Sequence, residues 1–148
     1  MTNPDIARLR ALLATLDTVS LTTLDDQFRP VSRPMMMCCN DFDGTLHLLT
    51  PARSRVVTHL AGMPTVNVSH VSAGSSLSLT GRADFTTDTS VVEQHWHDGV
   101  RAWLPNGPRD HALITVTVDE ARFWNVRNTV SSAMDELSVA TNATSDRP

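Results

Sequence analysis

The chain has 148 residues, a formal charge of −4 at pH 7 and a pI near 5.8, which suits a single domain with its own core. This acidic balance argues against a non-specific binder of nucleic acid or of anionic membranes, because such a protein needs a basic face. No apolar run approaches the roughly 20 residues that span a bilayer, and residues 1–10 contain no signal-peptide core. We therefore expect a cytoplasmic protein that contacts neither membrane nor nucleic acid.

Two missing residue types exclude further classes of chemistry. All 12 basic residues are arginine, so the chain has no lysine for a Schiff base or for a P-loop. It has no tyrosine for phenolic acid–base catalysis.

The two cysteines, Cys38 and Cys39, are adjacent, and neighbouring side chains of a strand point to opposite faces. We expect free thiols in a reducing compartment and no zinc site.

The first third of the chain predicts one helix followed by strands. Residues 4–16 place apolar side chains at helical spacing, with Pro4 as the first helical residue. Residues 19–24 are rich in β-branched side chains and predict a strand, and residues 25–27 predict a turn. A second strand is expected over residues 30–39, at a sheet edge or with a bulge because Pro34 cannot donate to a ladder. Asp43-Gly44 predicts a hairpin turn before a third strand at 45–50.

The remaining two thirds alternate between helices and strands. Pro51 starts a short helix over residues 51–61, which ends before Gly62. Asp88 is the expected N-cap of a second helix over residues 89–103. Four more strands are predicted, at residues 65–71, 76–85, 112–118 and 121–126.

These elements predict the fold class. Short connections between strands imply antiparallel pairing, so we expect an all-β-dominated α+β protein. Its six or seven strands would form a meander or Greek-key barrel, with three peripheral helices. We expect one domain over residues 1–128 and a poorly ordered C-terminal tail over residues 129–148, where Ser, Thr, Asn and Asp are frequent.

Arginines near the middle of the chain are the candidate binding residues. Arg33 could face solvent, or it could bind an anion. The neighbours on its face of the strand, Val31, Met35 and Met37, are apolar. A guanidinium on an apolar face needs a partner, so this pattern favours anion binding. Residues 50–55 combine a capping hydroxyl, a proline and the cations Arg53 and Arg55 at a helix start. The helix dipole disfavours cations there unless an anion sits between them, so we weigh a phosphate site against a plain exposed helix start.

Other chemistry-bearing residues give weaker signals. His95 and His97 are two apart on a predicted helix and face roughly opposite ways, and the other histidines are scattered without ligand spacing. We therefore expect structural roles for the histidines and no metal site. The methionines at 35–37 would fill the core or line a flat aromatic ligand. No catalytic acid or base can be assigned.

Several short segments, in a fixed order, resemble one known family. They are 31–35 (VSRPM), 41–44 (DFDG), 46–50 (LHLLT) with Ser54, 66–69 (VNVS), 77–83 (LSLTGRA), 101–107 (RAWLPNG) and 123–124 (FW). The stretch from residue 19 to residue 124 resembles the general stress protein branch of the pyridoxamine 5'-phosphate oxidase-like, flavin-binding split-barrel superfamily. The resemblance implies a six-stranded antiparallel split barrel, a homodimer and FMN at the subunit interface.

The resemblance also implies cofactor-binding residues. Arg33, Pro34 and Met35 would lie along the ribityl phosphate and ring edge, and Leu49 and Thr50 would line the flavin. Ser54 and Arg55 would hold the phosphate. Ser76 falls where related oxidases often place a glutamine near the ring.

The chain departs from the family pattern at two places. Val56 stands where related proteins usually have a lysine, so the phosphate would rest on Arg33, Arg53 or Arg55. The C-terminal segment lacks the Trp and Arg that hold substrate in true pyridoxamine 5'-phosphate oxidases, so we do not expect that activity.

The resemblance leads to a functional hypothesis with open alternatives. We expect an FMN-binding general stress-type protein that acts as a flavin-dependent oxidoreductase on an unknown substrate. The alternatives are a non-catalytic protein that sequesters FMN and a split barrel that binds haem or a deazaflavin.

Overall fold

The computed structural model of the protein describes residues 4–38, 42–104, 106–125 and 135–140. Their elements, in chain order, are α1 (Pro4–Leu13), β1 (Thr18–Leu24), β2 (Pro30–Met37), β3 (Thr45–Pro51), α2 (Arg55–Gly62), β4 (Thr65–Val71), β5 (Ser76–Thr86), α3 (Thr89–Gln94), α4 (Asp98–Trp103), β6 (His111–Asn125) and β7 (Asp135–Ala140). No helix among these elements is long and apolar enough to cross a membrane.

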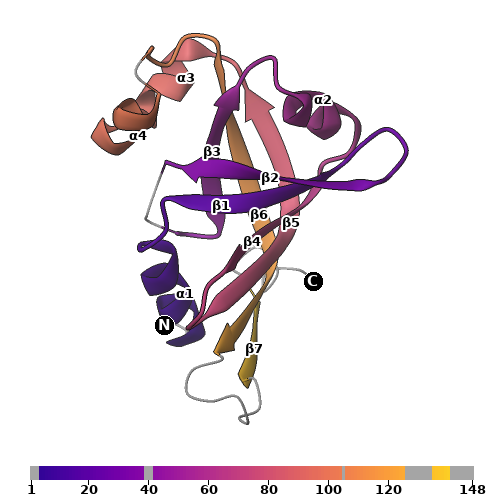
Figure 1. The fold of residues 1–148 in the computed structure, drawn as a ribbon, viewed down its shortest axis with the longest axis vertical. Coiled ribbons are helices and arrows are strands. Elements are labelled where there is room, and N and C mark those ends of the chain that lie inside the picture. The colour runs from indigo at the N-terminus through magenta and orange to yellow at the C-terminus, as the bar shows by residue number, and fades with distance from the viewer. Residues whose placement is uncertain (1–3, 39–41, 105, 126–134, 141–148) are drawn as a thin grey trace.

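Six of the strands form a closed antiparallel barrel. Their order is β3-β2-β1-β4-β5-β6, and pairing of β3 with β6 closes the ring (Figure 1). The seventh strand, β7, pairs with the last residues of β6 outside this ring. The predicted fold class, a six-stranded antiparallel split barrel with peripheral helices, is confirmed, although the described residues contain four helices rather than three.

The barrel interior follows from the alternation of side chains along each strand. In β1, Val19, Leu21 and Thr23 are buried and alternate with partly exposed residues. Helix α1 packs Leu9 and Leu13 against the barrel with no exposed surface. Helix α2 adds Val56 and Leu60 to the same core. Both helices therefore bury one apolar stripe against the sheet, as an amphipathic pattern requires.

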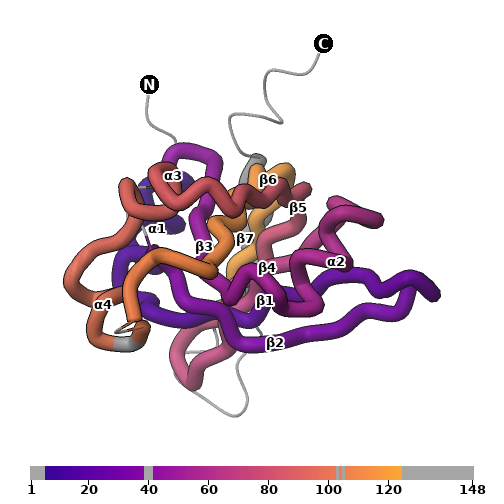
Figure 2. Tube along the Cα trace, turned by 90° about the horizontal axis from the view of Figure 1, so that it is seen from above, coloured from indigo at the N-terminus to yellow at the C-terminus, as the bar shows by residue number. Residues whose placement is uncertain are grey.

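A second, smaller core lies outside the barrel beneath α3 and α4. Val92 and Val100 of these helices pack with Leu49, Leu113 and Cys38. Figure 2 shows α3 and α4 on one side of the barrel, while the β1–β2 hairpin projects on the opposite side next to α2. The Cys38 side chain is buried and its Sγ donates to the His47 carbonyl oxygen at 3.2 Å, and Cys39 lies outside the described residues.

The predicted helix over residues 89–103 is instead two helices. Asp88 caps α3 as expected, accepting a hydrogen bond from the backbone N–H of Ser90 at 3.0 Å. His97 then caps α4, because its Nδ1 accepts from the backbone N–H of Gly99 at 3.2 Å. This side-chain cap starts a new helix where the apolar spacing alone predicted a continuous one.

The two strands predicted at 112–118 and 121–126 are one strand, β6, of 15 residues. Thr80 pairs with Glu120 and Gly81 with Val118, so Asp119 is an extra residue in a β-bulge. A Cβ added at Gly81 would lie 2.1 Å from the Thr117 carbonyl oxygen. The polar pair at 119–120 therefore marks a bulge and not a turn.

Two further differences between the predicted and the observed elements lie at the ends of segments. Pro51 ends β3 instead of starting a helix, and α2 begins at Arg55 with Ser54 as its N-cap. Strand β7 occupies part of the range 129–148, where the sequence predicts no element; the rest of that range lies outside the described residues. The division into a domain over residues 1–128 and a tail stays a prediction.

Candidate functional site

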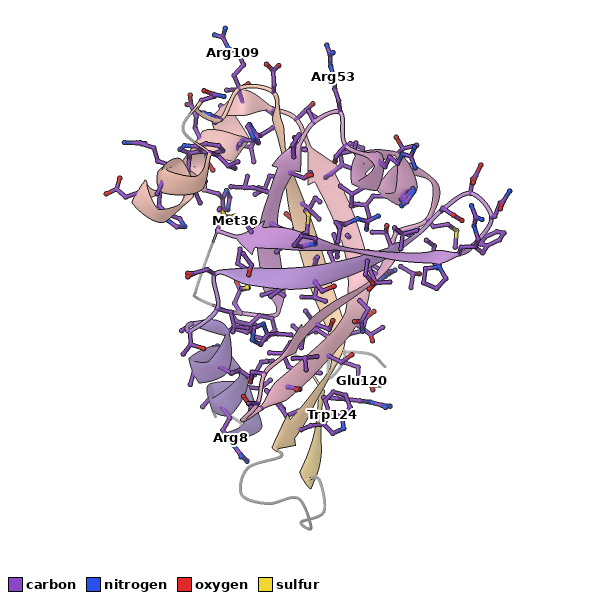
Figure 3. The ribbon with its side chains drawn as sticks, viewed as in Figure 1. Arg8, Met36, Arg53, Arg109, Glu120 and Trp124 are labelled. Atoms are coloured by element: carbon purple, nitrogen blue, oxygen red, sulfur yellow. The ribbon has the colours of Figure 1, made fainter. Side chains whose placement is uncertain are left out.

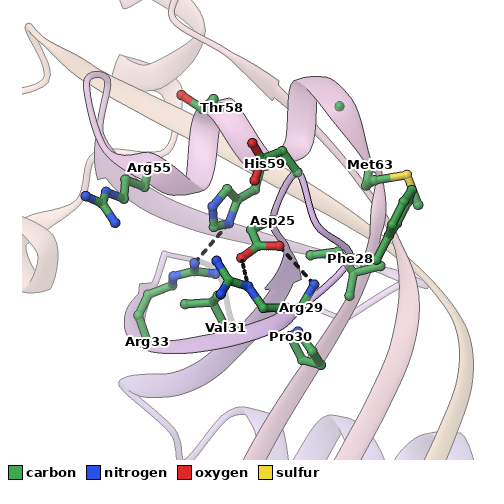
Figure 4. Close-up of a pocket in the computed structure, with 13 residues that line it drawn as sticks. Asp25, Phe28, Arg29, Pro30, Val31, Arg33, Arg55, Thr58, His59 and Met63 are labelled. Carbon is green, nitrogen blue, oxygen red and sulfur yellow. Dashed lines mark hydrogen bonds and ion pairs between the residues drawn. The ribbon is translucent and has the colours of Figure 1, made fainter.

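A cavity of about 820 Å³ lies between the β1–β2 hairpin and α2. Its polar lining includes three arginines, two aspartates and a histidine: Asp25, Asp26, Arg29, Arg33, Arg55 and His59. Its apolar lining includes Phe28, Pro30, Val31 and Met63. Figure 4 shows Arg55 at one end of this cavity and Phe28 and Met63 at the other, with Arg33 and His59 pointing toward each other. A cationic region thus adjoins an apolar one.

Arg33 contacts a hydroxyl, a carbonyl oxygen and an imidazole ring. Its Nη1 donates to Thr23 Oγ1 at 2.6 Å and to the Leu21 carbonyl oxygen at 3.3 Å. Its Nη2 lies 3.3 Å from His59 Nδ1 (Figure 4), and Thr23 Oγ1 lies 2.8 Å from the same nitrogen. Within the described part of the chain, no carboxylate pairs with Arg33. Partial burial lowers the pKa of Arg33, because desolvation disfavours its charged form.

Arg29 in the same cavity is held differently. Its Nε donates to Asp25 Oδ2 at 2.9 Å, which forms an ion pair within the hairpin turn. Asp25 Oδ1 also accepts from the backbone N–H groups of Gln27 and Arg29. The hydrogen bond from the Arg29 backbone is the largest cause that lowers the pKa of Asp25. The turn predicted at residues 25–27 is confirmed, and it neutralises Arg29 locally.

The structure brings only some of the predicted site residues together. Arg33 and Arg55 both line the cavity. Thr50 Oγ1 and Ser54 Oγ lie 2.9 Å apart at the junction of β3 and α2, where they connect the strand to the helix start. Arg53, by contrast, is exposed and points away from the barrel (Figure 3).

The other predicted residues lie elsewhere. The Met35 side chain is buried in the barrel core and Leu49 in the second core. Pro34 is exposed on β2 and does not line the cavity. Ser76 starts β5 opposite Trp124 and is also absent from the cavity lining. The flavin-binding roles of these residues stay predictions.

Thr23 and His59 were not among the predicted site residues, although both carry a signal. Thr23 shares the inward face of β1 with Val19 and Leu21, which makes it a polar residue in an apolar position. His59 follows Arg55 by four residues, so the two side chains lie on neighbouring turns of one helix face. Neither signal reveals that β1, β2 and α2 converge.

A pair of histidines lies near α3, away from this cavity. The rings of His47 and His95 have centroids 4.4 Å apart at 46°. His47 Nδ1 lies 3.2 Å from Thr115 Oγ1, and His95 Nδ1 donates to the Val91 carbonyl oxygen at 3.2 Å. Burial lowers the pKa of His47, and His95 lowers it further, while Asp43 partly opposes this. Across the described ranges, no group of three or more His, Cys, Asp or Glu side chains could hold a metal ion.

The lowered pKa of His47 predicts that the folded protein is less stable in acid. Because the pKa of His47 is below its usual value near 6.5, the folded protein binds fewer protons there than the unfolded chain. The free energy of unfolding should therefore decrease as the pH falls below about 6.5. Urea unfolding between pH 5 and 8 checks this, and His47→Gln should reduce the slope in the acidic range relative to the unmodified protein. An unchanged slope in His47→Gln would contradict the assignment.

Comparison with known proteins identifies the family. The sequence profile of the family described as "Pyridoxamine 5'-phosphate oxidase like" matches residues 4–146. The chain belongs to this family. No curated protein sequence matches the chain closely enough to identify a relative. The predicted superfamily is thus confirmed by the sequence profile.

Solved structures share the fold of this pyridoxamine 5'-phosphate oxidase-like protein. A Clostridium acetobutylicum protein related to general stress protein 26 of B. subtilis aligns with a TM-score of 0.80 and 17% identity, over 97% of this chain and 99% of that chain. General stress protein 26 from Bacillus anthracis aligns with a TM-score of 0.65 and 20% identity, over 90% and 98%. A heme binding protein from Mycobacterium smegmatis aligns with a TM-score of 0.68 and 17% identity, over 97% and 61%.

Proposed function

We propose that this protein binds FMN and is a cytoplasmic, flavin-dependent oxidoreductase of the general stress type. The observation that carries the proposal is the Arg33 guanidinium, which is partly buried at a cavity and lacks a carboxylate partner among the described residues. A cation in this state is stabilised by an anionic ligand. Family membership makes a flavin the ligand to test first.

The residues around the cavity fit a phosphorylated ring compound. Arg33 and Arg55 would hold the phosphate, since both line the cavity and neither forms an ion pair with another described residue. Phe28, Val31 and Met63 would supply apolar surface for the ring. When bound, FMN would supply two-electron transfer, while these side chains would bind and orient it.

We also propose a homodimer with the flavin at the subunit interface. The resemblance to the family supports this arrangement, and so does the exposure of apolar side chains on the projecting hairpin. Phe28 is 67% exposed and Val31 is 37% exposed, and both line the cavity. A partner subunit that covered them would remove apolar surface from water and enclose the ligand.

Two alternatives remain distinct from this proposal. The protein could sequester FMN without turnover. It could instead bind haem or a deazaflavin, because a heme binding protein shares the fold and carboxylate or phosphate groups of either ligand would suit the same arginines.

The visible spectrum of the freshly purified full-length protein, with its mass in solution, tests the proposal. We expect a flavin spectrum, or one that appears on addition of FMN, with one FMN per subunit of a dimer. Oxidation of NAD(P)H by the reconstituted protein would then distinguish an enzyme from a sequestering protein. A haem or deazaflavin spectrum, or failure to bind FMN, would refute the proposal.

A further inference from the structure

We propose that Thr23 and His59 are positioning residues that hold the Arg33 guanidinium with neutral acceptors, so that its full charge selects a phosphorylated ligand. This inference rests on the proposed function, because the ligand it concerns is the FMN phosphate. It adds two residues that the sequence did not identify. It also assigns them a role in specificity rather than in the stability of the fold.

The hydrogen-bond roles follow from the chemistry of the groups. A guanidinium N–H can only donate, so His59 Nδ1 must accept from Arg33 Nη2 and carry no proton. Thr23 Oγ1 accepts from Arg33 Nη1, so its hydroxyl hydrogen is free to donate to the same His59 nitrogen. We infer that the His59 ring is neutral with its proton on Nε2. Thr23 is fully buried, which fixes this end of the network.

The two arginines Arg29 and Arg33 of the cavity can be compared directly. Arg29 is held by the Asp25 carboxylate, whereas Arg33 is held by a hydroxyl, a carbonyl oxygen and an imidazole nitrogen. A carboxylate both orients and neutralises a guanidinium, but neutral acceptors only orient it. Arg33 is therefore positioned without losing charge, and it is better suited than Arg29 to bind an added anion.

Arg33 also retains unused donors. A guanidinium has five N–H groups, and the three contacts to described residues occupy two on Nη1 and one on Nη2. The Nε–H and the second N–H of Nη2 have no partner within the described segments. Two such donors can bind two oxygens of one phosphate group. The charge and the donors are thus both available at the cavity.

Replacing His59 by glutamate or by glutamine distinguishes an effect on the charge of Arg33 from an effect on the fold. In His59→Glu, a carboxylate would neutralise Arg33, and we expect FMN affinity to fall about 10- to 100-fold. In His59→Gln, a neutral amide oxygen can accept from Arg33, and FMN affinity should stay within about threefold of the unmodified protein. Thr23→Ser should likewise preserve FMN affinity, whereas Thr23→Val should reduce it.

Riboflavin, which is FMN without the phosphate, is the control ligand. Calorimetric titration should show riboflavin affinity unchanged in all four variants, since the positioning residues act through the phosphate alone. Equal losses of FMN and riboflavin affinity in His59→Glu would indicate general damage and overturn the inference. Equal FMN affinity in His59→Glu and His59→Gln would also overturn it while leaving FMN binding intact. If the unmodified protein binds neither flavin, the proposed function and this inference both fail.

A second measurement tests the hydrogen-bond roles of His59 and Arg33 without a ligand. Nitrogen-15 NMR of the histidine side chains in the full-length protein reports which ring nitrogen carries the proton. We expect His59 to be protonated on Nε2, and Arg33→Ala should alter the signal of its Nδ1. A proton on Nδ1 of neutral His59 would contradict the hydrogen-bond roles and overturn the inference.

Discussion

Arg33→Ala is expected to weaken FMN binding about 10- to 100-fold, because it removes a charge-assisted hydrogen bond worth about 1.5 to 3 kcal/mol. The guanidinium is partly buried at the cavity and pairs with no carboxylate of the described residues, so its charge is available to a phosphate. Riboflavin binding should change little. Fluorescence titration of both flavins measures the effect, with Arg55→Ala expected to act similarly and Arg53→Ala less.

The control for this substitution is Arg8→Ala. Arg8 is exposed on α1, and Figure 3 shows it at the end of the molecule away from Arg53 and α2. The two variants change net charge equally, so a general electrostatic effect would weaken FMN binding in both. If Arg33→Ala bound FMN as tightly as Arg8→Ala, Arg33 would not be a phosphate ligand.

Gly81→Ala is expected to reduce the free energy of unfolding by about 3 kcal/mol, with a fall in Tm of about 10 °C. The added Cβ would lie 2.1 Å from the Thr117 carbonyl oxygen and 3.0 Å from the Val118 Cα. These are backbone atoms of β6 at the bulge, so β5 and β6 would have to separate. Thermal unfolding followed by circular dichroism checks the effect.

Gly74→Ala is the matched control for this change. A Cβ at Gly74 would meet nothing within 4 Å, and the residue does not have a positive φ. We expect its Tm to stay close to that of the unmodified protein. A small effect of Gly81→Ala, similar to that of Gly74→Ala, would mean that the two strands approach less closely at the bulge than the structure indicates.

The strands of the barrel were predictable because their signals are local. β-Branched side chains mark β1 in the sequence, and polar turn residues such as Asp25 separate β1 from β2. Asp88 likewise predicts the start of α3. Sequence patterns of this kind depend on a few neighbouring residues, and the tertiary structure preserves them.

The elements that were predicted wrongly depend on distant contacts or on less common local chemistry. Asp119 and Glu120 are polar, as turn residues are, but pairing with β5 on one side absorbs Asp119 in a bulge and keeps β6 continuous. His97 caps α4 through its ring nitrogen, which apolar periodicity cannot reveal. Strand β7 forms by pairing with β6, and its segment has a composition that predicts a tail.

The candidate site was half predictable. Arg33 and Arg55 were identified from a cation on an apolar strand face and from cations at a helix start, and they line the same cavity. Thr23 and His59 are 36 positions apart and meet only because α2 packs beside β1. Their contact is a product of the closed barrel, so no local pattern could have joined them to Arg33.

A crystal structure of the protein grown with FMN tests the central claim most directly. We predict that the phosphate lies between α2 and the β1–β2 hairpin, with at least one of its oxygens within hydrogen-bond distance of the Arg33 guanidinium. Clear density for FMN with its phosphate elsewhere, and with Arg33 contacting only Thr23, Leu21 and His59, would contradict the account.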